Sequence, residues 1–353
     1  MMKYIDAIDY KVEVGGLPQS SFSDYLAQYD KSNKVILVDE NTHELCLSYL
    51  ITTFEELAQA EVILLPEGED NKQLEIAFGV WEALTEYRIG RHDLIINLGG
   101  GVITDMGGFI ASCYKRGVDF INIPTSLLAM VDASIGGKTG VNLGAFKNQI
   151  GVFSNPKAVY VDTSFLSTLP ELEVLSGIAE MLKHGLISDA DLFSRVAEQI
   201  NNVKSIDSDL LFACIEVKNR VVVQDPLESG VRKTLNFGHT IGHVIEGHYM
   251  NTLKLSHGHS IAIGMLLEAF LSVELASLSQ EEYLAIHHVI TAVYEIPLFT
   301  PADIMAMVDM LDNDKKNKGG KILSCLIPKI GKCTFDIEVN KDLFTRAFKA
   351  FQS

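Results

Sequence analysis

The first half of the chain repeats a pattern that admits few folds. Short runs of β-branched and other apolar residues begin at Lys34, Glu61, Asp93 and Asp119, and longer segments with helical periodicity separate them. Continuous apolar runs of this length are typical of parallel strands that helices cover on both faces. The run 157–162 is predicted to be a last strand of the same sheet. This half therefore predicts an α/β domain.

The pattern changes beyond Pro170. Apolar residues three or four positions apart predict helices over 171–185, 189–200, 207–223, 234–248 and 260–278. A hairpin over 321–326 and 332–337, around Pro328 and Gly331, is expected to interrupt the helices near the C-terminus. The second half is therefore predicted to be helical.

Composition excludes several classes of protein. The chain has 353 residues and a net charge of −17, so a broad nucleic-acid-binding face is not expected. The start of the chain lacks a signal peptide's apolar core, and no apolar run approaches the roughly 18–20 residues that span a bilayer. We expect a cytoplasmic protein that does not bind a membrane. The five cysteines are scattered, without a CxxC pair, and are expected to be buried free thiols.

The richest local motif runs from Asn97 to Phe109, and it joins a predicted strand to a predicted helix. Glycines in such a turn let backbone N–H groups approach a pyrophosphate. The dinucleotide fingerprint would need a third glycine where Thr104 stands. A nucleotide site and a tight packing turn both remain open here. Asp39, at the end of the first strong strand, is either a ribose ligand or a turn former.

A second glycine cluster contains Gly137-Lys138-Thr139, which resembles the phosphate loop of ATPases. That motif needs glycine where Asp132 stands, so an ATPase is not expected. What remains is a flexible loop in which Lys138 and Lys147, close to Asn148, could face an anionic ligand. Solvated lysines are the alternative.

A third motif is rich in histidine. His239 and His243 lie four residues apart, so on a helix they share a face, and Ser256-His-Gly-His259 follows them. Neutral imidazoles are common ligands of divalent zinc. Capping or core histidines are the alternative. A carboxylate ligand would have to come from elsewhere in the chain, and Glu180 is one candidate among many.

Ordered motifs over nearly the whole chain are similar to those of one family. They include Pro66-Glu-Gly-Glu-Asp-Asn-Lys72, Gly99-Gly-Gly-Val102, Gly136-Gly-Lys-Thr-Gly-Val-Asn142 and Leu235-Asn-Phe-Gly-His-Thr-Ile-Gly-His243. In them the chain resembles the 3-dehydroquinate synthases, sugar-phosphate cyclases of the shikimate pathway. The resemblance implies a Rossmann-like NAD-binding α/β domain over 1–168 and an all-α metal- and substrate-binding domain over 169–353, with a small hairpin near the C-terminus. It also implies a homodimer.

The resemblance also assigns roles position by position. It implies metal ligation by Glu180, His239 and His257, with zinc or cobalt as the ion. For NAD it implies Asp39, Asn41, Glu67, Gly68, Glu69, Asp70, Asn71, Lys72, Gly100, Gly101, Val102, Ile103, Thr104, Asp105, Thr125, Ser126, Lys138, Lys147, Phe165, Leu166, Ser167 and Thr168. For substrate it implies Arg116, Asp132, Lys138, Asn148, Lys183, Lys218, Arg232, Asn236, His243 and Lys316. Of these, Lys138, Lys183, His243, Asn236 and Asp132 are the expected catalytic residues. The choice of Lys316 over Lys315 is open.

The implied reaction converts 3-deoxy-D-arabino-heptulosonate 7-phosphate to 3-dehydroquinate and phosphate. It proceeds through transient oxidation by NAD at C5, phosphate elimination, re-reduction and intramolecular aldol closure. The substrate is a small sugar phosphate with a carboxylate, for which Arg232 is the expected partner, assisted by Lys218. Another sugar-phosphate cyclase, or a metal-dependent dehydrogenase similar to glycerol dehydrogenase, is the alternative. His259 departs from the family, in which Glu is usual, and is expected to face solvent.

Overall fold

The computed structural model describes residues 2–144, 146–203, 205–250, 252–253, 255–311 and 321–351. The chain forms two compact units, Met1–Pro170 and Glu171–Ser353. Each unit has a hydrophobic core of its own.

The first unit is built on a sheet. Among the described residues, seven strands pair in the order β1-β2-β9-β6-β5-β3-β4. Their bounds are β1 Lys3–Asp6, β2 Lys11–Val14, β3 Lys34–Asp39, β4 Glu61–Leu65, β5 Leu94–Gly99, β6 Asp119–Pro124 and β9 Ala158–Val161. Every pair is parallel except β1 with β2. The predicted parallel sheet is therefore confirmed, and the hairpin β1-β2 extends one edge.

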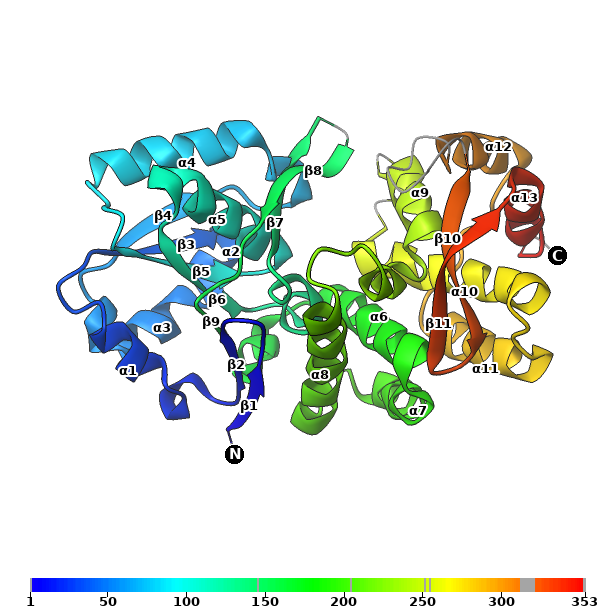
Figure 1. Ribbon diagram of the computed structural model, residues 1–353, viewed down its shortest axis with the longest axis horizontal. Helices are drawn as coiled ribbons and strands as arrows, with labels where there is room; N and C mark the ends of the chain where they lie inside the picture. Colours follow the sequence, from blue (N-terminus) through cyan, green and yellow to red (C-terminus); the bar gives the residue numbers. More distant parts are fainter. Residues whose placement is uncertain are drawn as a thin grey trace. The chain divides into compact units, whose positions relative to one another are not determined.

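Helices cover both faces of this sheet (Figure 1), with α4 and α5 on one face and α1 and α3 on the other. The helices are α1 Phe22–Ala27, α2 Glu40–Leu45, α3 Leu47–Thr53, α4 Leu74–Glu86 and α5 Gly101–Cys113. Shorter turns are η1 Leu17–Gln19, η2 Glu55–Leu57, η3 Glu69–Asn71, η4 Tyr114–Arg116, the π-turn η5 Ala129–Ala133 and η6 Thr163–Thr168. Strands β3 and β5 are buried almost throughout, which explains their uninterrupted apolar sequences.

The predicted flexible loop around Lys138 is instead an antiparallel hairpin. It consists of β7 Lys138–Leu143 and β8 Phe146–Phe153. Gly140 and Gly151 face each other in this hairpin, and a Cβ on Gly151 would lie 2.2 Å from the carbonyl oxygen of Thr139. The glycines that suggested a loop therefore permit close strand pairing.

The second unit is mainly helical. Its helices are α6 Glu171–Ser188, α7 Ala190–Gln199, α8 Ser208–Gln224, α9 His239–Tyr249, α10 His257–Leu275, α11 Gln280–Thr291, α12 Pro301–Met310 and α13 Lys341–Lys349, with short turns η7 Ile200–Asn202 and η8 Val231–Asn236. The predicted hairpin is confirmed as β10 Ile322–Lys329 and β11 Lys332–Val339. Its apolar residues join α9, α10, α12 and α13 in one core.

The helix predicted over 234–248 is wrong at its start. Residues Val231–Asn236 form a 3₁₀ turn, Gly238 has φ of +81°, and α9 begins only at His239. A residue in the left-handed region interrupts a right-handed helix, and glycine adopts it readily. The break places His239 in the first turn of its helix.

Two further features bear on the expectations from composition. Helix α10 is long and apolar enough to cross a membrane by those criteria alone, but 72% of its 18-residue window is buried inside the protein, as in a core helix. The five cysteines are free, as expected. The expectation that all are buried is wrong for Cys113, which is exposed, and Cys333 is partly exposed.

Candidate functional site

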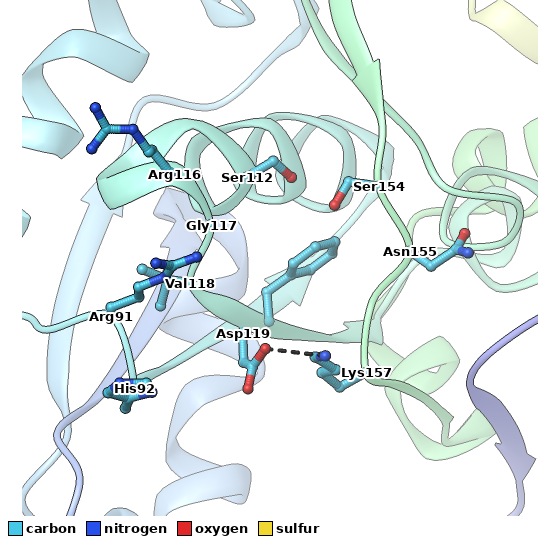
Figure 2. Close-up of a pocket in the computed structure, with 11 residues that line it drawn as sticks. Arg91, His92, Ser112, Arg116, Gly117, Val118, Asp119, Ser154, Asn155 and Lys157 are labelled. Atoms are coloured by element: carbon cyan, nitrogen blue, oxygen red, sulfur yellow. Dashed lines mark ion pairs between the residues drawn. The ribbon is translucent and has the colours of Figure 1, made fainter.

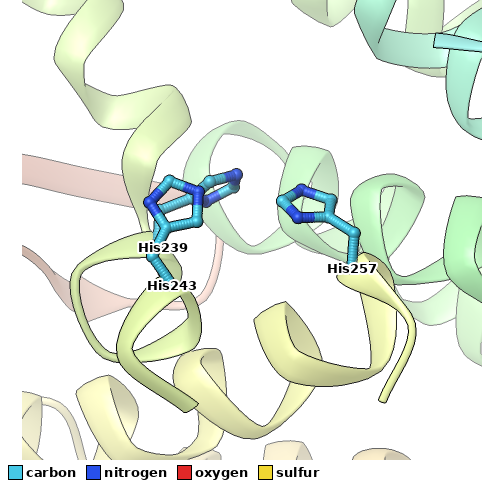
Figure 3. A group of neighbouring side chains, drawn as sticks. All are labelled: His239, His243 and His257. Atoms are coloured by element: carbon cyan, nitrogen blue, oxygen red, sulfur yellow. The ribbon is translucent and has the colours of Figure 1, made fainter. Parts of the chain in front are cut away.

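Three histidines meet in the second unit. His239 and His243 lie one turn apart on α9, and His257 is the first residue of α10. Figure 3 shows the three rings turned toward one another, with centroids 5.2–5.8 Å apart. One ring nitrogen from each lies within 4.8 Å of the others. This confirms that His239 and His243 share a helix face.

A buried carboxylate joins the imidazoles. Glu180 on α6 is 1% exposed, and its Oε1 lies 3.6 Å from His239 Nε2 and 3.9 Å from His257 Nε2. This oxygen accepts no hydrogen bond from the described residues. The other oxygen, Oε2, forms an ion pair with Lys183 one turn further along α6. A buried acceptor aimed at two imidazole nitrogens is an arrangement that a cation would satisfy.

The orientation of His239 follows from its second ring nitrogen. His239 Nδ1 lies 3.2 Å from the carbonyl oxygen of Phe237, which can only accept. Nδ1 therefore carries a proton, which leaves Nε2, the nitrogen nearer Glu180, as the ring atom available to a metal ion.

The N-terminus of α9 is fixed by a buried carboxylate from another helix. Glu268 on α10 is fully buried, and it accepts hydrogen bonds from the backbone N–H groups of Gly238, Thr240 and Ile241 at 2.8, 3.1 and 3.3 Å. These are among the N–H groups that a helix cannot satisfy internally. Glu268 thereby holds the turn that carries His239.

Close helix packing brings His257 to the cluster. The N–H of Gly258 donates to Ser176 Oγ on α6 at 3.0 Å, and a Cβ on Gly258 would lie 2.1 Å from the Ser176 carbonyl oxygen. A Cβ on Gly264 would lie 2.0 Å from the carbonyl oxygen of Gly238. Glycine at these two positions lets α10 approach α6 and α9 closely enough to assemble the site.

Three predicted cations are buried in this unit. Lys183, Lys218 and Arg232 are 1%, 7% and 1% exposed and lie on α6, α8 and η8. Arg232 Nη1 donates to the Pro226 carbonyl at 2.5 Å. Cations are rarely buried unless they are paired, and Lys183 is paired with Glu180.

Two acidic residues shape the loop before Arg232. Asp225 accepts from the backbone N–H groups of Ser229, Gly230 and Arg232 at 2.7–3.0 Å. Burial works to raise the pKa of Asp225, but these N–H groups hold it below its usual value. Glu228, with φ of +58°, accepts from the side chain of the predicted substrate residue Asn236 at 2.7 Å. The loop is therefore built around its carboxylates.

The loop after α11 contacts the two helices that carry Glu180 and His257. Tyr294 donates its hydroxyl to the Leu175 carbonyl on α6 at 2.7 Å. Burial, and then the charge of Glu180, raise the pKa of Tyr294, so it stays a donor. His259 Nε2 donates to the Glu295 carbonyl at 2.7 Å. His259 is partly exposed, in line with the expectation that it faces solvent, and its ring also ties α10 to this loop.

In the first unit, the residues predicted for NAD follow the carboxyl ends of adjacent parallel strands. Asp39 ends β3, the segment 67–72 follows β4, Gly100 and Gly101 follow β5, and Thr125 and Ser126 follow β6. The Phe165–Thr168 segment lies in η6, after β9. The carboxyl edge of an open α/β sheet is where such folds bind ligands.

The glycine turn also has a packing function. A Cβ on Gly99 would lie 2.6 Å from the Cβ of Ile103, so glycine is required there for the strand to meet its helix. The packing alternative thus holds for Gly99. Asp39 caps α2 by accepting from the N–H of Thr42 at 2.8 Å, and the Asn41 side chain donates to Glu67. Both residues therefore shape the same edge.

A buried lysine of this unit contacts two other predicted residues, one through an ion pair and one through a hydrogen bond. Lys72 Nζ donates to Asp105 Oδ2 at 2.6 Å and to Asn148 Oδ1 at 2.7 Å. Desolvation works to lower the pKa of Lys72, but Asp105 and Glu69 hold it above its usual value. Lys72 therefore remains a cation that joins α5 to β8.

Arg116 lies at the opposite edge of the sheet. It follows α5, whose 13 residues extend roughly 20 Å from the glycine turn. Arg116 lines a cavity of about 420 Å³ together with Arg91, His92 and Lys157 (Figure 2). Lys157 pairs there with Asp119 at 3.3 Å. Lys138 and Asn148 of the β7-β8 hairpin are not among the described residues that line this cavity.

Comparison with known proteins decides the family. Residues 62–176 match the 3-dehydroquinate synthase N-terminal family, and residues 177–317 match the 3-dehydroquinate synthase C-terminal family. A 3-dehydroquinate synthase from Parabacteroides distasonis is 37% identical over 329 residues, which are 92% of either chain. The chain belongs to the 3-dehydroquinate synthase family. The predicted resemblance is confirmed, and membership of this family makes the chain an enzyme.

Solved structures share the fold. The 2-epi-5-epi-valiolone synthase of Streptomyces hygroscopicus subsp. jinggangensis, solved with NAD+ and Zn2+, aligns with a TM-score of 0.85 at 26% identity, over 99% of this chain and 98% of that one. A 2-deoxy-scyllo-inosose synthase complexed with carbaglucose-6-phosphate, NAD+ and Co2+ aligns with a TM-score of 0.86 at 24% identity, over 99% of each chain. The predicted dehydroquinate synthase-like fold is confirmed.

Several residues of the site were not predicted. Glu246, Glu268 and Tyr294 are in ordinary helical or loop sequence, where a single glutamate or tyrosine carries no local signal. No sequence motif marks Asp225 or Glu228. Lys316 and Lys315 lie outside the described residues, so the assignment to Lys316 stays a prediction.

Proposed function

We propose that this enzyme of the 3-dehydroquinate synthase family converts 3-deoxy-D-arabino-heptulosonate 7-phosphate to 3-dehydroquinate and phosphate. The reaction class is that of a carbon–oxygen lyase that needs NAD and one divalent metal ion. The observation that carries the proposal is the convergence of Glu180 Oε1 with the Nε2 atoms of His239 and His257.

The donor set fits a Zn2+ or Co2+ ion. Bonds of 2.0–2.1 Å in a tetrahedral site place ligand atoms roughly 3.3–3.5 Å apart. The distances of 3.6 and 3.9 Å from Glu180 Oε1 to the two imidazole nitrogens are close to this. Three protein ligands leave a coordination position for substrate, and the bound ion would act as a Lewis acid on its hydroxyl oxygens.

The carboxyl edge of the sheet in the first unit is the proposed NAD site. Asp39 and Asn41 would meet the ribose side, while the glycine turn at Gly100–Asp105 would meet the pyrophosphate. The segment Glu67–Lys72, with Thr125, Ser126 and Phe165–Thr168, would complete the site. Bound NAD would supply a hydride acceptor that returns its hydride within the same turnover.

Arg232 and Lys218 are proposed to bind the substrate carboxylate. Arg232 has a planar guanidinium that matches a carboxylate in a bidentate way, and its burial removes competing water. A sugar lacking the carboxylate would leave these charges without this partner. This is the reason to favour an acidic sugar.

A second set of residues is proposed to bind the phosphate group of the substrate. Asn236 and His243 from the second unit, with Lys138, Asn148 and Lys316, would cradle the leaving phosphate. Lys183, beside Glu180, would hold a proton near the reacting carbons, and Asp132 with Lys138 would complete the catalytic groups. Lys147 is a further proposed ligand. Arg116, which the sequence motifs also implied, is not included, because it lines the cavity at the opposite edge of the sheet.

The direct test mixes the enzyme, Zn2+ or Co2+, NAD and the heptulosonate phosphate, and then measures inorganic phosphate and NADH absorbance together. The proposal expects phosphate release without net NADH, since the cofactor is regenerated. Accumulating NADH would indicate a dehydrogenase instead. Phosphate release from glucose 6-phosphate but not from the heptulosonate would indicate a different cyclase.

Three further parts of the proposal rest on the sequence and the family resemblance alone. They are a cytoplasmic location, a homodimer, and a division at residues 168 and 169 between an NAD-binding and a metal- and substrate-binding domain. Size-exclusion chromatography with light scattering tests the dimer.

A further inference from the structure

A second carboxylate stands beside the histidines. Glu246 lies seven residues after His239 and three after His243, so it shares their face of α9. It is 9% exposed, and its Oε2 lies 3.3 Å from His257 Nδ1, at the start of α10. The sequence motifs assign no function to Glu246.

The contact determines which nitrogen of His257 is available. A carboxylate accepts and does not donate, so His257 Nδ1 carries the proton in this hydrogen bond. Nε2 is then left with its lone pair, and this atom lies 3.9 Å from Glu180 Oε1. His239 reaches the same tautomer through the carbonyl of Phe237.

His257 needs this restraint more than His239 does. Its side chain is 33% exposed, whereas that of His239 is 11% exposed, so packing restrains the His257 ring less. A hydrogen bond to Glu246 limits rotation of the ring and keeps Nε2 aimed at Glu180. Outer partners of this kind orient ligating histidines in many metal sites.

We propose that Glu246 is a positioning residue for the metal site. It holds His257 as the Nδ1–H tautomer with Nε2 directed at Glu180, without itself binding the ion. The inference rests on the proposed function, since it takes Glu180, His239 and His257 as ligands.

The test compares variants that remove or keep the acceptor. Glu246→Ala removes it, Glu246→Leu removes it while keeping most of the volume, and Glu246→Gln keeps an acceptor oxygen. Zn2+ affinity of the full chain is measured by competition with a chromophoric chelator, with no NAD or substrate present. We expect Ala and Leu to weaken Zn2+ binding by about 10- to 100-fold, and Gln to restore most of it. The visible absorption of bound Co2+ should shift in Ala and Leu but not in Gln.

The same helix offers a matched control. His248 Nε2 lies 2.8 Å from Asp303 Oδ1, a histidine–carboxylate pair on α9 whose carboxylate comes from α12. Asp303→Ala, which removes the acceptor as Glu246→Ala does, should lower the thermal stability of the chain while Zn2+ affinity and the Co2+ spectrum stay unchanged. A loss of affinity equal to that in Glu246→Ala would show general loosening of α9 and overturn the inference.

Other outcomes decide the remaining cases. Parental Zn2+ affinity in Glu246→Leu, or an equal loss in Gln and Leu, would overturn the positioning role. If Glu246→Ala does not fold, the Zn2+ affinities of Glu246→Leu and Glu246→Gln are compared instead. His257→Ala separates the two proposals: if it binds Zn2+ like the parent, the proposed metal site itself fails. If it loses Zn2+ while Glu246→Leu does not, only the role of Glu246 fails.

Discussion

Arg232 shows how a buried charge can be prepared before a ligand arrives. Arg232 is 1% exposed, and its Nη1 donates a hydrogen bond to the Pro226 carbonyl. The backbone N–H of Arg232 donates to Asp225 Oδ2 at 3.0 Å. These contacts fix the position of the guanidinium in advance, so substrate binding need not order it.

We expect Arg232→Ala to raise KM for the heptulosonate phosphate by about 10- to 100-fold, because a hydrogen bond to a charged group contributes about 1.5–3 kcal/mol. NAD affinity should not change, since NAD is assigned to the first unit. Steady-state kinetics and NAD titration measure both. Lys233→Ala is the control, because that neighbouring cation pairs with Asp336 at 2.6 Å instead. An unchanged KM in Arg232→Ala would remove the assignment.

Asp225 gives a prediction in pH. Its folded-state pKa is lowered, so its contribution to stability is present above the unfolded pKa of about 3.9 and is lost as pH falls through the folded value. Asp225→Asn should therefore destabilise the chain at neutral pH, and its difference from the parent should shrink in acid. Urea unfolding at about pH 7 and pH 3 measures this. A difference that grows in acid would contradict the assigned shift.

At the scale of residues, the sequence motifs pointed to the proposed metal ligands but not to the residues that hold them in place. His239 and His257 stand out because they lie in a glycine-rich context. Glu246 and Glu268 do not, because a glutamate in a helix is most often a solvated residue. Their function depends on what α9 and α10 place opposite them, which no local spacing records.

At the scale of elements, α9 depends on a cap from another helix. Glu268 satisfies three N–H groups of its first turn. We expect Glu268→Leu to lower the free energy of unfolding by about 3 kcal/mol or more, since each buried N–H left unsatisfied costs about 1–3 kcal/mol. Urea denaturation of the full chain measures the change.

The matched control for that cap is local and exposed. Ser279 caps α11 through its Oγ and the N–H of Glu282. Ser279→Ala should cost about 0.5–2 kcal/mol and leave Zn2+ affinity unchanged. Glu268→Leu should weaken Zn2+ binding as well, because it loosens the turn that carries His239. Equal effects of the two substitutions would mean that the Glu268 contacts contribute no more than an ordinary cap.

Element boundaries were predictable where the hydrophobic period was uniform. Strands β3 and β5 match their apolar runs, and the C-terminal hairpin was expected from Pro328 and Gly331. The start of α9 was not, because apolar periodicity continues through Gly238 although its φ of +81° ends any helix there. Glycine pairs likewise concealed the β7-β8 hairpin, since glycine is typical of both loops and close strand pairing.

At the scale of the whole molecule, the chain combines a strongly negative net charge with buried cations. A net charge of −17 stands beside Lys183, Lys218 and Arg232, each less than 10% exposed. The boundary between the two units near Pro170 could be predicted from the sequence, because β-branched runs before it give way to helical periodicity after it. The meeting of Glu180 with His239 and His257 was implied by the family resemblance and by no local spacing, because it depends on helices far apart in the chain.

The measurement that bears most directly on the account is phosphate release by exhaustively chelated enzyme, with NAD and the heptulosonate phosphate present, before and after Zn2+ or Co2+ is restored. The account predicts no release until the ion returns, and no recovery in Glu180→Ala at an ion concentration that saturates the parent. Full release from the chelated enzyme would contradict it.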